Sequence, residues 1–226
     1  MGIDYTKHRA PSAAGDVNRG SGPDKLTLTK NERSVDLTKS GERQGVMRVN
    51  LNWTDPGPAG KPGFFAKLLG ASGGIDLDLG CLYELADGSK GVVQALGNSY
   101  GDLNRPPFIA LDRDDRTGAV TGGENLHINL ADPGAFRRIL VFAMIYEGAA
   151  NWAAVDGVVS MYPTAGPQIE VRLDSAVDGA RICAVALLTN TGRGLTVGRE
   201  VEYVDGGQAD LDRAYQWGLR WAAGRK

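Results

Sequence analysis

The sequence predicts an all-β protein, a β-sandwich of two antiparallel sheets with a C-terminal helix. Two observations lead to this fold class. Glycine accounts for 32 of the 226 residues, about twice its usual share of ~7%, without the Gly-X-Y period of collagen. Such a content indicates many tight turns, and short strand-like segments recur between them. Only one stretch, near the C-terminus, has the spacing of a helix.

The predicted strands are short segments in which apolar and polar residues alternate, or in which apolar residues are unbroken. In chain order they cover residues 25–30, 34–39, 46–53, 75–85, 91–96, 108–111, 125–130, 138–146, 157–162, 169–173, 182–188 and 195–203. We expect the first two to be joined by a turn at residues 31–32. The continuous apolar run at 138–146 is typical of a central strand buried on both faces. About a dozen strands with little helix favour two packed sheets.

The chain divides by composition into a tail and a domain. Residues 1–23 mix Gly, Ser, Pro and Ala with scattered charges and have no apolar period. Such a segment cannot bury enough surface to offset the entropy of ordering it, so we expect a flexible N-terminal tail. Residues 24–226 are predicted to form the sandwich domain, including the C-terminal helix.

The helix is predicted at about residues 208–223. Asp210 and Asp212 lie in its first turns and basic residues near its end, as the helix dipole favours. Apolar residues at helical spacing define one face, which Trp217 and Trp221 widen. Two interpretations remain open, because these tryptophans could pack on the sandwich or dock a partner protein.

Composition and charge limit the function. The net charge of -2 argues against a nucleic-acid-binding protein, which usually has a basic excess. No stretch approaches the 18 or so apolar residues of a membrane span, and no signal peptide opens the chain. Cys81 and Cys183 lie far apart without a CxxC partner, which excludes a zinc ribbon and predicts two buried free thiols. His127 alone lies in a strand, so a histidine metal cluster is not expected.

Acidic residues gather in three places that could hold a metal. On a strand, Asp76 and Asp78 share one face while the leucines between and after them face the core. The second place is a loop and the third lies just before a strand. The six candidate ligands are Asp76, Asp78, Asp112, Asp114, Asp115 and Glu124. Carboxylate oxygens in glycine-rich loops are typical Ca²⁺ ligands.

The acidic loop is not an EF-hand. If Asp112 were its first position, Arg116 would stand at the fifth, Thr117 at the sixth and Gly123 at the twelfth, and none of these fits. The residues alone therefore leave three interpretations of the acidic groups. They could be a calcium site, a solvated acidic rim, or the carboxylates of an enzyme.

Several separated motifs resemble the TerD domain family, the bacterial tellurium-resistance and general stress proteins. These are Ile-Asp-Leu-Asp-Leu-Gly-Cys-Leu-Tyr at 75–83, Asp-Asp-Arg-Thr-Gly at 114–118, Gly-Gly-Glu-Asn-Leu-His-Ile-Asn-Leu at 122–130, and the opening strand at 25–30. The chain is most similar to the TerA-type branch. The motifs typical of that branch are Gly-Val-Val-Gln-Ala-Leu-Gly at 91–97, Ile-Tyr-Glu-Gly-Ala-Ala-Asn-Trp at 145–152, and 212–221.

The resemblance implies a β-sandwich that binds calcium between loops at one end, in a family for which no catalytic activity is established. The six acidic residues named above match acidic or oxygen-bearing positions of that family. Gly74, however, stands where many members have another Asp, and 119–123 lacks the usual acids. One site, or one site with a weak second site, is therefore expected in place of the usual two-ion arrangement. Glu147 and Asn151 match polar positions near the same end.

The function expected from sequence is that of a cytoplasmic, calcium-binding, non-catalytic stress-response protein that acts as a binding or scaffold module. Its expected partners are calcium ions and the proteins of a stress complex that associates with membranes, and no nucleic acid. One alternative is a protein- or carbohydrate-binding sandwich with vestigial metal loops. Another is a hydrolase that uses Asp76 or Asp78 with Glu124.

Overall fold

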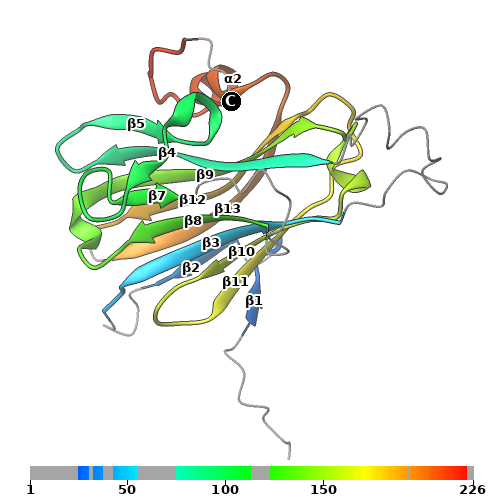
Figure 1. Ribbon diagram of the computed structural model, residues 1–226. Coiled ribbons are helices and arrows are strands. Elements are labelled where there is room, and N and C mark those ends of the chain that lie inside the picture. The colour runs from blue at the N-terminus through cyan, green and yellow to red at the C-terminus, as the bar shows by residue number, and fades with distance from the viewer. Residues whose placement is uncertain are drawn as a thin grey trace, which may run out of the picture.

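Two β-sheets pack face to face in the computed structural model (Figure 1). The structure describes residues 25–30, 33–37, 43–54, 75–112, 123–192 and 194–222. The predicted tail at 1–23 lies outside these residues, as do Asp114 and Asp115. The all-β sandwich with a C-terminal helix that the sequence predicts is confirmed.

The larger sheet has seven strands in the order β1-β11-β10-β3-β8-β7-β6. Its neighbours are antiparallel except for β1 and β11, which run parallel. The strands are β1 (Lys25–Thr27), β3 (Val46–Asn52), β6 (Gly101–Asp102), β7 (Ile109–Leu111), β8 (Glu124–Asn129), β10 (Gly157–Tyr162) and β11 (Gln168–Leu173). The two-residue β6 is too short to produce an alternating pattern, and the sequence did not predict it.

The smaller sheet has six antiparallel strands in the order β2-β13-β12-β9-β4-β5. They are β2 (Ser34–Asp36), β4 (Asp76–Leu85), β5 (Lys90–Val93), β9 (Phe136–Glu147), β12 (Ile182–Asn190) and β13 (Leu195–Val204). Single 3-10 turns occur at Leu96–Asn98, Pro133–Ala135 and Trp152–Ala154. The long apolar strand β9 lies inside this sheet, which confirms its predicted central position.

The main core lies between the sheets and follows the alternation of the strands. On β4, Leu77, Leu79 and Cys81 are fully buried in it, as the pattern predicts. Leu126 and Ile128 of β8 enter the same core from the other sheet. Cys81 and Cys183 are both buried free thiols, as expected.

The first two strands do not form the hairpin that the sequence suggested. β1 pairs with β11 in the larger sheet, and β2 pairs with β13 in the smaller one. Leu28 and Leu37, just after each strand, are buried, and their amides donate to Glu170 and Leu195 of different sheets. Two segments that look alike in sequence therefore join different sheets, and each buries the leucine that follows its strand.

The C-terminal helix is shorter than predicted. α2 covers Gln208–Ala214, and the chain continues without helix to Ala222. The carboxylate of Asp212 accepts hydrogen bonds from the amides of Gly218 and Leu219, both at 2.8 Å. Gln216 and Gly218 have positive φ values of 53° and 81°. These bonds and backbone turns stop the helical period, so Trp217 and Trp221 are not neighbours on one helix face.

Residues 208–222, which we call the C-terminal strap, cover the outer face of the smaller sheet (Figure 1). Leu211 and Trp217 pack there in a second apolar cluster. Its sheet members are Leu82, Leu140, Phe142, Met144, Ile182 and Ala184. Trp217 is 1% exposed, so packing on the sandwich is the correct interpretation for this residue. Trp221 is half-buried against the same cluster.

Candidate functional site

The first part of the candidate site is the strand β4, which carries two of the predicted acidic ligands. Asp76 and Asp78 lie at the start of β4. Their side chains leave the strand on the face opposite to that of Leu77 and Leu79. Asp76 is half-buried. Asp78 is 4% exposed, and both of its carboxylate oxygens are shielded from solvent. A carboxylate is costly to bury unless other groups compensate its charge, so this position makes Asp78 the most distinctive acid of the site.

Glu124 reaches the same strand from the opposite sheet. β5 pairs with β4 only over Cys81–Glu84, so among the described strands none pairs with residues 76–80 along that edge. The Leu79 amide points out of this edge and donates a hydrogen bond to Oε2 of Glu124. Glu124 and the buried Leu126 are two residues apart on β8, so both side chains lie on the same face of the strand. Glu124 therefore points toward the smaller sheet. The structure therefore brings the Glu124 carboxylate beside the backbone of the residue that follows Asp78.

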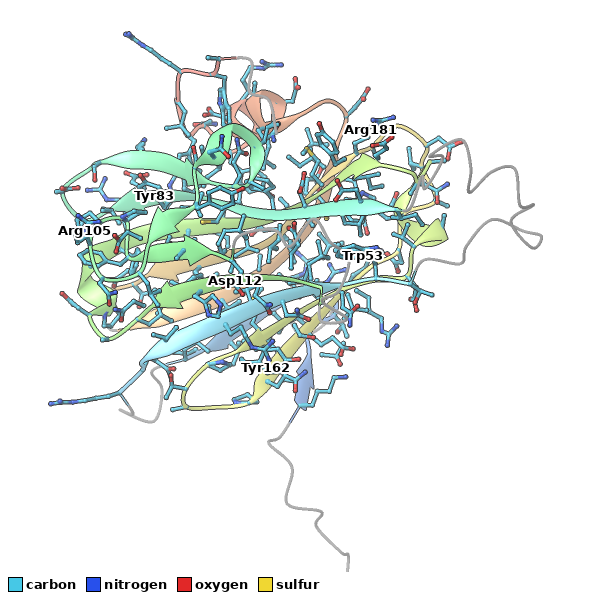
Figure 2. The ribbon with its side chains drawn as sticks, viewed as in Figure 1. Trp53, Tyr83, Arg105, Asp112, Tyr162 and Arg181 are labelled. Atoms are coloured by element: carbon cyan, nitrogen blue, oxygen red, sulfur yellow. The ribbon has the colours of Figure 1, made fainter. Side chains whose placement is uncertain are left out.

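Asp112 directly follows β7, on the larger sheet (Figure 2). Its Oδ1 is 3.1 Å from Nε2 of His127, and its amide donates to the carbonyl of Asn125. Because Ala110 pairs with His127 across β7 and β8, Asp112 and His127 lie on the outer face of the larger sheet. Glu124 points to the inner face. The structure thus directs the side chains of Asp112 and Glu124 to opposite faces of the larger sheet.

Two further candidates lie near the start of β4. Asp76 is the direct cross-strand partner of Glu147 on β9. Like charges in directly opposite positions repel each other unless a cation relieves them. Asn151 has other partners: its Oδ1 accepts the amide of Ala154 at 3.0 Å, and its Nδ2 donates to Asp178 at 2.7 Å. Its amide therefore stabilises the 3-10 turn that follows.

The described residues do not complete a metal site. Within them, no three His, Cys, Asp or Glu side chains lie close enough together to hold an ion. Asp114 and Asp115 belong to the segment 113–122, which is outside the described residues and joins Asp112 to the strand that carries Glu124. The oxygen donors present suit a hard cation such as Ca²⁺. Asp76, Asp78 and Glu124 are the predicted ligands at this end of the fold.

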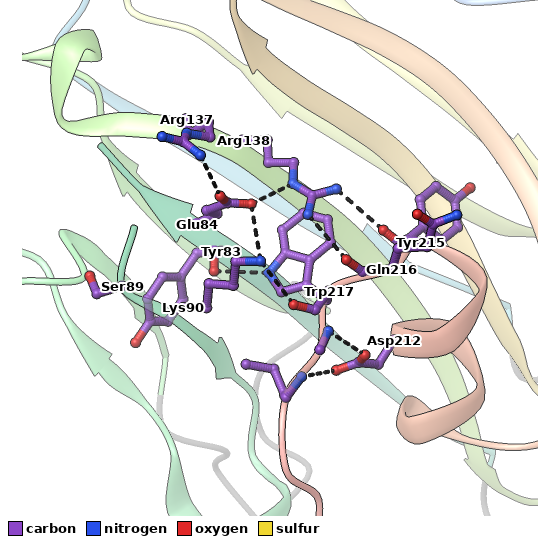
Figure 3. Close-up of polar contacts among 12 residues, drawn as sticks. Tyr83, Glu84, Ser89, Lys90, Arg137, Arg138, Asp212, Tyr215, Gln216 and Trp217 are labelled. Carbon is purple, nitrogen blue, oxygen red and sulfur yellow. Dashed lines mark hydrogen bonds and ion pairs between the residues drawn. The ribbon is translucent and has the colours of Figure 1, made fainter. Parts of the chain in front are cut away.

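A second charged group was missed by sequence reasoning. Glu84 is buried on β4 and accepts from Arg137 at 3.0 Å and from Arg138 Nε at 2.8 Å (Figure 3). Lys90 lies 3.7 Å from the same carboxylate and donates to the carbonyl of Trp217. The adjacent arginines were visible in the sequence, but only the β4–β9 register places them against Glu84.

The pKa of Glu84 reflects these contacts. Burial by itself would raise the pKa of this carboxyl group. The hydrogen bond from Arg138 and the charges of Arg138, Lys90 and Arg137 outweigh burial and hold the pKa below its ordinary value. Glu84 is therefore ionised at neutral pH and holds the C-terminal strap to the sheet through its cations. Its role here is structural.

The buried thiols are poor candidates for chemistry. Burial raises the pKa of Cys81 and of Cys183 far above the ordinary value, against smaller opposing effects of the Val93 backbone and Arg199 respectively. Both groups therefore stay protonated at neutral pH, whereas nucleophilic attack and metal binding need the thiolate.

In the part of the chain that the structure describes, no helix has the length and apolar character needed to cross a membrane.

Comparisons with known proteins identify the family. No family model matches the chain. The tellurium resistance protein TerA of an Alcaligenes species is 41% identical over 202 residues, which are 89% of this chain and 58% of that protein. The chain thus spans less than two thirds of this relative. The chain is also similar to a solved homologue of the telluride resistance protein TerD from Streptomyces coelicolor A3(2). The match includes 75% of this chain and 95% of that chain, with 22% sequence identity and a TM-score of 0.49. The identity with TerA shows that the chain belongs to the TerD/TerA-type family of tellurium-resistance proteins.

Proposed function

We propose that this chain is a calcium-binding, non-catalytic module of tellurium resistance, with the ion at the end of the sandwich where β4 begins. The observation that carries the proposal is the buried carboxylate of Asp78, whose oxygens are shielded from water beside the point where Glu124 contacts β4. A divalent cation compensates such carboxylates by direct coordination.

The proposed ligands are Asp76, Asp78 and Glu124, completed by Asp114 and Asp115 of the segment 113–122. In an antiparallel ladder the N–H and C=O of one residue point to the same side. The carbonyl of Leu79 is therefore directed to the edge where its amide meets Glu124. Carboxylates together with a backbone carbonyl are the donors that Ca²⁺ uses in loops. In this proposal Asp112 remains the partner of His127 and contributes less.

Several observations favour a binding role over catalysis. A carboxylate hydrolase would need one acid to protonate a leaving group and another to activate water or attack the substrate. Here one oxygen of Glu124 already accepts a backbone amide and links the two sheets. The relative is named for resistance to tellurium and not for a reaction. We further propose a cytoplasmic location and protein partners in a stress-response complex.

The test is a calorimetric titration of the chelator-treated protein with calcium. Wild type and Asp87→Asn should bind calcium equally. The Asp87 carboxylate lies in a turn with Ser89, at the other end of β4. Glu124→Gln should bind at least about tenfold more weakly, because one ligand charge is lost. If all three proteins fail to bind calcium, the proposal is wrong and the alternative of a binding sandwich with vestigial metal loops takes its place.

A further inference from the structure

The C-terminal strap is attached to the smaller sheet through side chains and not through backbone pairing. Among the described residues, the strap amides that form hydrogen bonds find their acceptors inside the strap or at Gly207. The sheet reaches the strap with side chains, since Arg138 and Lys90 donate to the carbonyls of residues 215–217 (Figure 3). The strands beneath are already paired with one another, so the strap is added to a complete sheet.

The strap holds its own shape through a buried carboxylate. Asp212 is 4% exposed. It accepts three hydrogen bonds, from the amides of residues 218 and 219 and from the indole N–H of Trp221. Because these bonds lie inside the strap, they persist when the strap leaves the sheet. Only the side-chain links to the sheet then break, and such a unit opens at a lower free energy than the strands beneath it.

A glycine hinge joins the strap to β13. Its three residues are Asp205, Gly206 and Gly207, and the first two are exposed. Gly206 has a φ of 113° in the folded-back chain, a conformation that other residues rarely adopt. Glycine also takes extended conformations at no steric cost, so the hinge permits a second direction for the strap.

The face beneath the strap is apolar at its centre and positively charged at one end. Its apolar side chains are those of the second cluster. At the charged end three cations, Lys90, Arg137 and Arg138, outnumber the one carboxylate that they contact, Glu84. The strap is complementary to both parts, since Trp217 fills the apolar centre and the carbonyls after α2 meet the cations. Large apolar patches are seldom left open on soluble proteins, so an open face calls for an equivalent occupant.

A second copy of this chain carries the segment that fits this face. When two copies exchange straps, each face receives the same Trp217 side chain, the same carbonyls and the same apolar contacts that it has in the single chain. Only the hinge changes its conformation. Exchange of identical elements in this way is a simple route to closed two-fold dimers.

We propose that the C-terminal strap is exchangeable and that two copies of this chain form a dimer by docking it on each other. The apolar face under the strap is then the self-association surface of the module. This dimer goes beyond the proposed calcium binding and involves none of the proposed ligands. A short hinge keeps the strap at an effective concentration of about a millimolar beside its own face, so wild type is mainly monomeric below that concentration.

The test changes the hinge and measures molecular mass by light scattering after gel filtration. In Gly206→Val the new Cβ would clash with the Asp210 carboxylate, at a φ that valine disfavours, so folding back is penalised. The variant should dimerise at least about tenfold more tightly than wild type, the factor expected from one strained backbone position. Gly179→Val is the matched control, because Gly179 also has a positive φ but has open space around it and lies outside the hinge. It should remain monomeric like wild type.

A synthetic peptide of residues 205–222 distinguishes strap exchange from an ordinary surface contact. In excess it should occupy the face and convert the Gly206→Val dimer into monomers that carry one peptide each, as native mass spectrometry would show. The same peptide with Trp217→Ala should leave the dimer intact, because it lacks the ring that fills the apolar cluster.

Three outcomes would overturn the proposal. They are a folded Gly206→Val that stays monomeric, equal dimerisation of Gly179→Val, and a dimer that does not respond to the peptide. If circular dichroism shows Gly206→Val to be unfolded, wild type at millimolar concentration decides the question. It should then form a dimer that the peptide dissociates, and absence of that dimer would equally exclude strap exchange.

Discussion

The guanidinium of Arg138 lies over the indole ring of Trp217, with its carbon atom 3.8 Å from the ring centre. The same guanidinium bonds Glu84 and the carbonyl of Tyr215. The indole N–H donates to the carbonyl of Tyr83 at 3.0 Å. One arginine of β9 thus connects a buried carboxylate of β4 with the backbone and the main aromatic ring of the C-terminal strap.

Replacing Trp217 with alanine should destabilise the whole domain. The side chain is 1% exposed and fills the apolar cluster under the strap, so its loss leaves a cavity that costs about 3–5 kcal/mol. Urea unfolding followed by circular dichroism measures the change. Arg220→Ala, at an exposed position of the same strap, should change the free energy of unfolding by less than about 0.5 kcal/mol. Equal stability of both variants would mean that the strap is not part of the cooperative fold.

Glu84→Gln should destabilise the protein at neutral pH and less so in acid. Removing one partner of a buried ion pair costs about 3 kcal/mol, at the lower end of the usual range because Arg137 is largely exposed. Since the folded pKa of Glu84 lies below its ordinary value, this stabilisation is complete above about pH 4.3 and is lost as the pH falls through the folded pKa.

The measurement is the urea midpoint of wild type and Glu84→Gln between neutral pH and acid. The difference in urea midpoint between wild type and Glu84→Gln should become smaller below about pH 4.3. Glu202→Gln, at an exposed position of β13, is the control and should follow wild type throughout. A constant difference at all pH values would show that Glu84 does not titrate with the fold.

The two cysteines should react only after unfolding. Burial shields Cys81 and Cys183 and raises the pKa of each thiol, so the thiolate is scarce even at alkaline pH. Alkylation by iodoacetamide, followed by mass spectrometry, should be slow in the native protein and complete in urea. Rapid native labelling of either residue would contradict its place in the core.

Calcium should raise the melting temperature. A ligand that binds only the folded state at a hundredfold excess over Kd adds about 2.7 kcal/mol, or about 5–10 °C for a domain of this size. Magnesium should have a smaller effect because it demands tighter octahedral geometry. Asp78→Asn should remove most of the gain and Asp87→Asn should keep it. Identical melting temperatures with calcium and with chelator would mean that these acidic residues form a solvated rim that binds no metal.

Most strands could be located from the sequence because strand formation and burial depend on a local alternation. On β4 the pattern of leucines and aspartates predicted a strand at 75–85, and the structure has it at Asp76–Leu85. The same alternation correctly placed Leu77 and Leu79 in the core. The continuous apolar run of β9 identified a strand covered on both faces. These properties require only the repeat of two residues along one segment.

The candidate site could be predicted in part. The sequence identified the acidic residues and, through the family resemblance, their end of the fold. It did not reveal that Asp112 contacts His127 on the outer face of the larger sheet, because that pair depends on the register of β7 with β8. The anchoring of the strap by Lys90 and Arg138 was invisible for the same reason.

The sequence by itself therefore determined the fold class, the positions of the long strands and the identity of the acids, because each follows from local periodicity or residue chemistry. Tertiary structure alone decided that β1 and β2 join different sheets, that α2 ends at Ala214, and that Glu124 meets the amide of Leu79. These outcomes depend on contacts between segments distant in the chain, where burial and hydrogen bonding outweigh the local pattern.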